Sequence, residues 1–398
     1  MGSENNDHQQ TALTEDFDST SDAEESCPAL DSDLRALVDR YLTSQRTTGS
    51  QAYASTAASV LNRWAAWMAT ESHELDELND SQAGPRVLNE YALQLAKRVA
   101  DDELVAATAE RYFAIVSACL SFGVRQGALD RNPALAEAAS ESLPQQQRSD
   151  RTDQQFWTPA QRQAIVEFVD EQAAAAPDTA LIENRNRALV RVLAYSGVRG
   201  AEVLSHTKDD REGRNGLRWE NVDFDAGTML IFGKNQTWER TPLPSKCLPA
   251  VRDLHSALDP DDGQWPVFPS GHSPSLYDKA RAELGDRFDR LLAAEQGDIW
   301  QLLRTQNISP PPLTTAGARS VMKRLTDGAD FEVDGEYLKL HGGRRGLGDL
   351  LYRIDRGHAQ DILRHDDLST TQKAYQHIDA EERREQLDSY LEDANESV

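Results

Sequence analysis

Lysine, cysteine and long hydrophobic runs are scarce in this chain of 398 residues. Only 8 of its 42 basic residues are lysines, and the three cysteines, Cys27, Cys119 and Cys247, are too widely spaced for a metal-ligand motif. No apolar run approaches the ~18 residues that cross a membrane, and the first residues contain neither the basic nor the apolar part of a signal peptide. We therefore expect a cytoplasmic protein with no membrane span and with buried or incidental thiols.

The charge balance is strongly acidic, with 67 Asp and Glu residues and a formal net charge of −25. Nucleic-acid-binding proteins are normally basic, so this balance argues against DNA as a partner. Negative charge combined with few lysines is also typical of an extreme halophile, whose proteins stay hydrated in a salt-loaded cytoplasm. At multimolar salt the Debye length falls below ~3 Å, so binding to DNA would depend on short-range contacts. Composition alone leaves both interpretations open.

Composition and periodicity divide the chain into five segments. Residues 1–30 contain no Lys or Arg and predict an acidic, disordered tail. Residues 31–135 carry four amphipathic helical patterns and predict a small helical bundle. Residues 136–155 are polar and Gln-rich, as in a linker. Residues 156–390 form a second, larger domain, and residues 391–398 form a C-terminal tail.

The second domain is predicted to be mainly helical with one small β-sheet, which gives an α+β fold class. Residues 158–161 read Thr-Pro-Ala-Gln, a capping box with Pro at the first helical position, and predict a helix start. Short strands at 228–232 and 238–243 flank the sequence Gly-Lys-Asn-Gln at 233–236, which predicts a hairpin.

Six residues suited to phosphodiester chemistry follow one another through this domain. They are Arg199, Lys234, His341, Arg344, His365 and Tyr375. The third and fourth lie one helical turn apart and therefore share a helix face. Guanidinium and imidazole groups stabilise charge on phosphoryl oxygens, and a phenol can act as a covalent nucleophile. The set favours attack on a phosphodiester without a metal or any other cofactor.

With these residues the chain resembles the tyrosine recombinase (phage integrase) family, over about residues 31–385. The first family box, roughly T-G-x-R-x-x-E-x-x-x-L, is matched at Gly197, Arg199 and Glu202. The catalytic lysine of a β-turn is matched by Lys234. The second box, H-x-x-R followed by L-G-H and a tyrosine, is matched by the last four of the six residues.

The resemblance implies DNA cleavage and rejoining through a 3′-phosphotyrosyl bond to Tyr375. Arg199, Arg344 and His365 would stabilise the pentavalent phosphate. His341 would assist proton transfer, and Lys234 would protonate the departing 5′-oxygen. The resemblance also implies an N-terminal core-binding (SAM-like) domain and a C-terminal catalytic domain that bind double-stranded DNA, with a monomer when free and a homotetramer on DNA.

Some features depart from the family pattern. Residues 341–344 read His-Gly-Gly-Arg in place of H-D-L-R, and Arg364 stands where the family has Gly. Taken alone, Arg199 is suited equally to catalysis and to a surface ion pair with Glu202. We expect Glu202 to orient a neighbouring group or to cap the helix locally. A recombinase-fold protein that only binds DNA, as an accessory factor, is the second hypothesis. Arg345 points about 100° away from Arg344 around the helix, so Arg344 is assigned to the site. Tyr352 and Tyr390 lack the flanking motif of Tyr375 and are poorer candidates for the nucleophile, and we expect His358 and His377 to be structural or surface groups.

Overall fold

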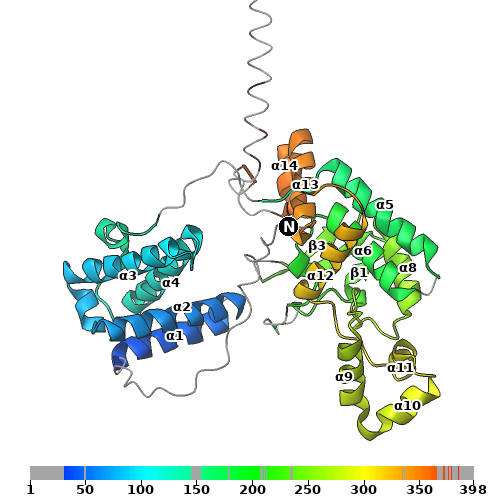
Figure 1. Cartoon of the computed structure of the whole chain (residues 1–398), viewed down its shortest axis with the longest axis horizontal. Helices are drawn as coiled ribbons and strands as arrows, with labels where there is room; N and C mark the ends of the chain where they lie inside the picture. Colours follow the sequence, from blue (N-terminus) through cyan, green and yellow to red (C-terminus); the bar gives the residue numbers. More distant parts are fainter. Residues whose placement is uncertain are drawn as a thin grey trace, which may run out of the picture. The chain divides into compact units, whose positions relative to one another are not determined.

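A computed structural model describes most of the chain between residues 31 and 384. The described residues are 31–48, 51–144, 154–177, 180–206, 209, 211, 213–233, 236–333, 335, 337–364, 371, 372, 375, 378 and 384. The chain divides into two compact units, residues 1–148 and residues 149–398. Helices make up most of both units, and the second also holds a three-stranded sheet (Figure 1). The predicted α+β fold class, mainly α with a small sheet, is confirmed.

The first unit is a helical bundle. Its elements are α1 (Ser32–Thr48), α2 (Gln51–Thr70), η1 (Leu75–Asn79), α3 (Ala83–Ala100), α4 (Ala106–Arg125), η2 (Pro133–Leu135) and η3 (Glu137–Ser140). Apolar residues recur with the helical period, so each helix turns one face inward. Leu37, Trp64, Leu88 and Leu120 are fully buried in the shared core.

Both ends of the predicted linker, residues 136–155, are packed. Ala139 in η3 is fully buried, and η3 contacts α3. At the other end, the Gln155 side chain is buried because its amide binds the backbone of Tyr337 and Lys339, at 2.8 and 2.6 Å. Residues 145–153 and the two predicted tails lie outside the described residues. The described ends of this segment therefore pack on the two units, and its role as a linker stays a prediction.

The second unit begins with the predicted capping box. Thr158 and Gln161 each bind the backbone N–H of the other at the start of α5. The elements of this unit are α5 (Pro159–Ala175), α6 (Leu181–Tyr195), α7 (Gly200–Val203), η4 (Trp219–Asn221), β1 (Val222–Asp223), β2 (Thr228–Phe232), β3 (Trp238–Pro242), α8 (Leu248–Leu258), α9 (Ser273–Leu284), η5 (Gly285–Arg287), α10 (Phe288–Ala294), α11 (Ile299–Thr305), α12 (Thr315–Gly328), α13 (Leu340–Ile354) and α14 (Arg356–Leu363).

Helix α6 lies at the centre of the second unit. It packs against α5, α8 and α13, and Leu189, Val190 and Leu193 are fully buried there. The sheet is antiparallel with the order β1-β2-β3, and the predicted hairpin pairs Phe232 with Trp238. Helices α9, α10 and α11 enclose a small separate core and extend from the rest of the unit (Figure 1).

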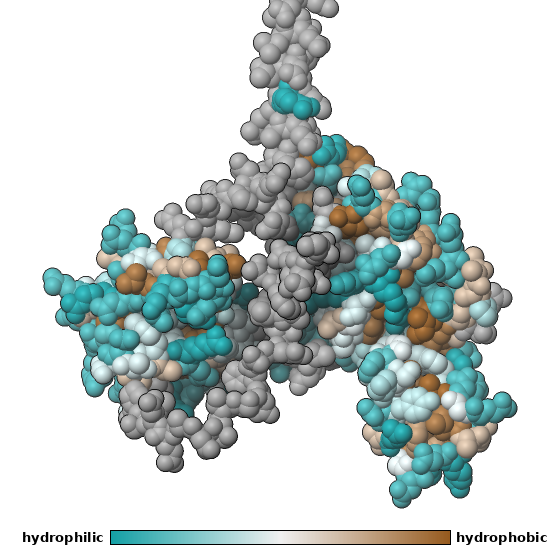
Figure 2. Space-filling view, viewed as in Figure 1, coloured by the Kyte–Doolittle hydropathy of each residue, from teal (hydrophilic) through white to brown (hydrophobic). Residues whose placement is uncertain are grey.

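The described surface is largely hydrophilic on the face shown in Figure 2. Arginines in the described part of the chain often pair with acidic groups: Asp170, for example, accepts from both Arg187 and Arg191. Among the described residues, no helix combines the length and the apolar character needed to cross a membrane.

Candidate active site

The corner after α6 presents Arg199. Gly197 has a φ of +70°, a conformation that glycine adopts without strain, and the chain turns here into α7. Glu202 fixes the arginine twice: one carboxylate oxygen accepts its backbone N–H at 2.7 Å, and the other accepts from Nη1 at 2.9 Å. The ion pair with Glu202 is thus present. The Arg199 side chain nevertheless keeps 26% of its surface exposed, whereas the Glu202 side chain keeps 1%.

Helix α13 carries His341 and Arg344 in its first two turns. Arg344 is only 2% exposed, and its guanidinium donates to the backbone carbonyls of Gly197 and Leu363. These bonds join α13 to the corner after α6 and to the end of α14. Burial, followed by the positive charge of Arg199, lowers the pKa of Arg344 to about 9. The guanidinium therefore stays positive at neutral pH.

His341 lies on the exposed side of α13. Partial desolvation, followed by the positive charges of Arg345 and Arg344, lowers the pKa of this imidazole to about 4. The ring is therefore neutral at pH 7 and has a free acceptor nitrogen. Arg345, which we set aside because it points away from Arg344 along the helix, lies close enough to act electrostatically on both His341 and Tyr375.

Tyr375 is buried, with 2% exposure. Its ring centroid lies 5.3 Å from that of Tyr352 and 6.3 Å from that of Phe156. Burial raises the pKa of Tyr375 to about 12, and the charges of Arg344 and Arg345 oppose this rise. The phenol is therefore protonated at neutral pH, close to the helix that carries two of the cations.

Four of the six predicted residues can be located. Arg199, the α13 residues His341 and Arg344, and Tyr375 come from three segments that are distant along the chain, and Arg199 and Tyr375 both act electrostatically on Arg344. Lys234 and His365 lie outside the described residues, although the residues before them, Gly233 and Arg364, are described. The described part of the chain contains no group of three or more His, Cys, Asp or Glu that could hold a metal ion.

Trp157 and the Leu193 carbonyl leave no room for side chains at the two unusual glycines of the second box. A Cβ at Gly342 would lie 2.5 Å from the Trp157 ring, and one at Gly343 would lie 2.4 Å from the carbonyl oxygen of Leu193. Trp157 is 1% exposed and donates its indole N–H to the carbonyl of Lys339 at 3.0 Å. The indole occupies the space that a side chain at position 342 would need, and the Leu193 carbonyl occupies that of one at position 343. Sequence reasoning missed this partner because it lies far away along the chain.

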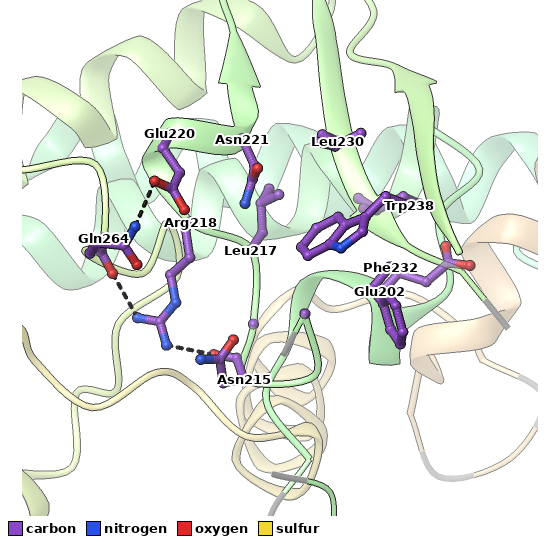
Figure 3. Close-up of a pocket in the computed structure, with 13 residues that line it drawn as sticks. Glu202, Asn215, Leu217, Arg218, Glu220, Asn221, Leu230, Phe232, Trp238 and Gln264 are labelled. Carbon is purple, nitrogen blue, oxygen red and sulfur yellow. Dashed lines mark hydrogen bonds between the residues drawn. The ribbon is translucent and has the colours of Figure 1, made fainter. Parts of the chain in front are cut away.

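A cavity of about 440 Å³ lies beside the β2–β3 hairpin (Figure 3). Leu230, Phe232 and Trp238 face it from the hairpin. Opposite them, Arg218 donates to the backbone carbonyls of Gln264 and Asn215, at 2.9 and 3.1 Å. Of the candidate site's described groups only Glu202 also lines this cavity, which has no contact with the site's arginines. It is therefore a neighbouring cavity rather than the phosphate position.

The Phage integrase family profile matches residues 155–382, more than half of the chain. The chain belongs to the phage integrase family. It is 31% identical over 96 residues to tyrosine recombinase XerC of Xylella fastidiosa strain M23, which covers 24% of this chain and 29% of that protein. It is 25% identical over 199 residues to tyrosine recombinase XerC of Halalkalibacterium halodurans, which covers 50% of this chain and 51% of that protein.

Solved structures of integrases and recombinases share the fold of this phage integrase family member. The Tn1549 transposon integrase in complex with transposon right end DNA has a TM-score of 0.55 at 14% identity, covering 88% of this chain and 98% of that one. The XerH recombinase bound to palindromic difH substrate has a TM-score of 0.54 at 17% identity, covering 92% and 98%. A lambda integrase dimer on a core site has a TM-score of 0.51 at 12% identity, covering 86% and 94%.

Proposed function

We propose that this chain is a site-specific DNA recombinase that cleaves and rejoins double-stranded DNA through a 3′-phosphotyrosyl intermediate. The observation that carries the proposal is that α13 of a phage integrase fold contacts both the corner that presents Arg199, through the bond from Arg344 to Gly197, and the hydroxyl of Tyr375, beside Gly348. The XerH and Tn1549 neighbours were solved on DNA, which supports DNA as the substrate.

In the proposed reaction, Tyr375 attacks the scissile phosphorus in line with the 5′-oxygen. A bond forms from the phenolic oxygen to phosphorus while the bond from phosphorus to the 5′-oxygen breaks. The phenolic proton passes to neutral His341, and Lys234 gives a proton to the departing 5′-oxygen. The phosphotyrosyl ester conserves the bond energy, so the reverse sequence rejoins DNA without ATP.

The cations give a protonated phenol its reactivity. Arg199, Arg344 and His365 would stabilise negative charge as it develops on the phosphoryl oxygens. A bound phosphodiester would also offset the positive charges that lower the pKa of His341. The imidazole then becomes a better proton acceptor in the complex than in the free protein.

We also propose how the chain is organised around DNA. The first unit would be the core-binding domain and residues 156–390 the catalytic domain. A monomer would bind each half of the recombination site, and four protomers would complete the reaction, with the segment 378–391 docked on a neighbouring protomer. The acidic composition supports an origin in an extreme halophile.

One observation favours the second hypothesis, a DNA-binding accessory protein with a recombinase fold. Tyr375 is buried against Tyr352 and Phe156, and Glu202 holds Arg199. A protein that never cleaves DNA has no need to release either residue. The two functions differ in whether a covalent protein–DNA adduct forms.

Covalently attached DNA recovered from cells and sequenced would identify the recombination site. A nicked duplex of that site then traps the adduct, because the short strand beyond the cleaved bond dissociates. Wild-type protein should give an SDS-stable adduct that forms equally well with EDTA. Tyr375→Phe should bind the same DNA and give no adduct.

Tyr352→Phe is the matched control, because Tyr352 is equally buried in the same cluster. It should still form the adduct. An adduct in Tyr375→Phe would show that another residue is the nucleophile. Specific binding by wild type with no adduct would support the accessory function instead.

A further inference from the structure

Arg364 ends α14 in a backbone conformation that favours glycine. Its φ and ψ are both 53°, in the left-handed region where a side chain is crowded by its own backbone. The residue directly precedes His365. Its side chain is only 12% exposed, so it turns inward rather than into solvent. An arginine kept in this conformation must gain from contacts that glycine cannot make.

Three protein groups from two other segments hold the guanidinium of Arg364. Its Nη2 donates to Glu202 Oε2 at 2.6 Å, and its Nη1 donates to Thr241 Oγ1 at 2.7 Å. Its Nε lies 3.2 Å from Glu239 Oε2. Two of the three nitrogens therefore donate to the protein's own acceptors, and Nε is paired with the Glu239 carboxylate by charge and not by a hydrogen bond. The planar fork of arginine suits such a set, and the single ammonium of lysine does not.

The first of these contacts leads to Arg199. Glu202 follows α7's start and binds both the backbone and the guanidinium of Arg199. Its carboxylate is therefore shared between Arg199 and Arg364. A second positive partner limits the directions in which this carboxylate can hold Arg199.

The contact with Glu239 leads to the hairpin turn. Glu239 lies against Gly233: a Cβ at Gly233 would be 2.5 Å from Glu239 Oε1. The N–H of Gly233 in turn binds the carbonyl of Thr237 at 2.8 Å, which closes the base of the turn. Lys234 is the next residue after Gly233. Arg364 thus contacts the residue that packs beneath this turn.

The backbone beside Arg364 is also fixed. The carbonyl of Leu363, the preceding residue, accepts from the buried guanidinium of Arg344. Segments that carry four of the six proposed catalytic residues therefore meet at the end of α14.

We propose that Arg364 is a positioning residue, which holds the segment of His365 to the hairpin turn of Lys234 and to the carboxylate that fixes Arg199. The inference rests on the proposed recombinase function. It gives the arginine, at a position where the family has glycine, a role that does not involve contact with DNA. Its loss should chiefly impair protonation of the leaving 5′-oxygen, because Arg199 keeps both of its own bonds to Glu202, whereas the β2–β3 hairpin loses its contacts with the end of α14.

The test compares Arg364→Gly with wild type on two nicked duplexes of the recovered site. One has the ordinary scissile phosphate, and the other carries sulfur in place of the bridging 5′-oxygen. A thiolate leaves without protonation, so the second substrate does not need a positioned Lys234. On the ordinary substrate, the variant should form adduct ~10–100-fold more slowly, the scale of a misplaced group. On the sulfur substrate it should come within about threefold of wild type.

Two results would overturn the proposal. Equal rates for Arg364→Gly and wild type on the ordinary substrate would mean that the arginine is merely tolerated. Equal slowing on both substrates would mean that it does not act through the leaving group. Absence of a wild-type adduct on either substrate is a separate result, because it contradicts the proposed function itself.

Further variants separate positioning from folding. Arg364→Gly loses the contacts of the guanidinium with buried Glu202 and Thr241, so its melting temperature should fall even though glycine relieves the left-handed backbone, and both adduct assays are run well below that temperature. Asp259→Gly is the matched control: Asp259 also ends a helix with a positive φ, of 47°, yet it is exposed. It should leave adduct formation unchanged. Glu239→Gln should show the same sulfur rescue as Arg364→Gly, and the double variant should be no slower than the slower single one. Additive effects would contradict a shared role.

Discussion

The hydroxyl of Tyr375 lies against Gly348 so closely that a Cβ at Gly348 would stand 1.9 Å from the phenolic oxygen. Gly348 lies one helical turn beyond Arg344 on α13, so both face the same side of the helix. The absence of a side chain at one position thus makes room for the proposed nucleophile in the free protein. The hydroxyl of Tyr375 therefore lies about one helical turn along α13 from Arg344, whose guanidinium is buried.

Gly348→Ala should displace Tyr375 from this position. A methyl group cannot fit 1.9 Å from an oxygen, so the tyrosine or the helix must move. Overpacking of this kind costs ~1–3 kcal/mol, which outweighs the ~0.5–1 kcal/mol that alanine contributes to a helix. Urea unfolding should show the net loss, and Tyr375 should become accessible to nitration.

Gly357→Ala is the control for that variant. It is also a helical glycine, but its Cβ would meet only Asp355 Oδ1, at 3.3 Å. It should be neutral or stabilising. A Gly348→Ala protein as stable as wild type, with Tyr375 still protected from nitration, would show that the tyrosine is not held as described.

Arg344→Lys should damage both stability and adduct formation. One ammonium cannot satisfy the carbonyls of Gly197 and Leu363 together, and an unsatisfied buried acceptor costs ~1–3 kcal/mol. Loss of the planar guanidinium of Arg344 beside the phosphate should slow adduct formation by ~10²–10³-fold. Arg353→Lys, on the exposed side of the same helix, should change neither. Normal adduct formation by Arg344→Lys would remove Arg344 from the proposed mechanism.

His341 should make the folded state sensitive to acid. Its pKa is about 4 in the folded protein, against an ordinary value of 6.5. Between these pH values the imidazole is protonated in the unfolded chain but not in the folded protein. The contribution of His341 to the free energy of unfolding is therefore full above pH ~6.5 and is lost as pH falls from ~6.5 to ~4. His341→Gln should lose less stability across this window than wild type, as measured by urea unfolding at several pH values. Parallel profiles for the two proteins would contradict a neutral His341.

The local structure around the candidate site was predictable from the sequence, because short patterns of residues determine helix starts and hairpins. The capping box at Thr158 and the hairpin that pairs Phe232 with Trp238 were found at the predicted places. The placement of His341 and Arg344 one turn apart on one helix was also predicted, although His341 is exposed and Arg344 is buried. These features depend on neighbours within a few residues, where helix and turn rules apply.

The partners of the site could not be predicted in the same way. Trp157 fills the space above Gly342, and Arg364 reaches Glu202 and Thr241, across separations of well over 100 residues. No local pattern carries such contacts, so both positions looked like simple departures from the family motif. The resting position of Tyr375 depends likewise on packing against Gly348 rather than on its own flanking sequence.

Salt should stabilise the folded chain, because a net charge of −25 repels itself when unscreened. The Debye length is ~10 Å at 0.1 M salt and ~3 Å at 1 M, so most of the relief should come below ~1 M KCl. Exposed ion pairs weaken over the same range and act in the opposite direction, but each contributes little. Melting temperature should therefore rise steeply up to ~1 M and more slowly beyond. A rise that begins only above ~1 M would indicate salting-out of apolar surface instead. Undiminished stability at ~0.1 M salt would contradict the halophile proposal.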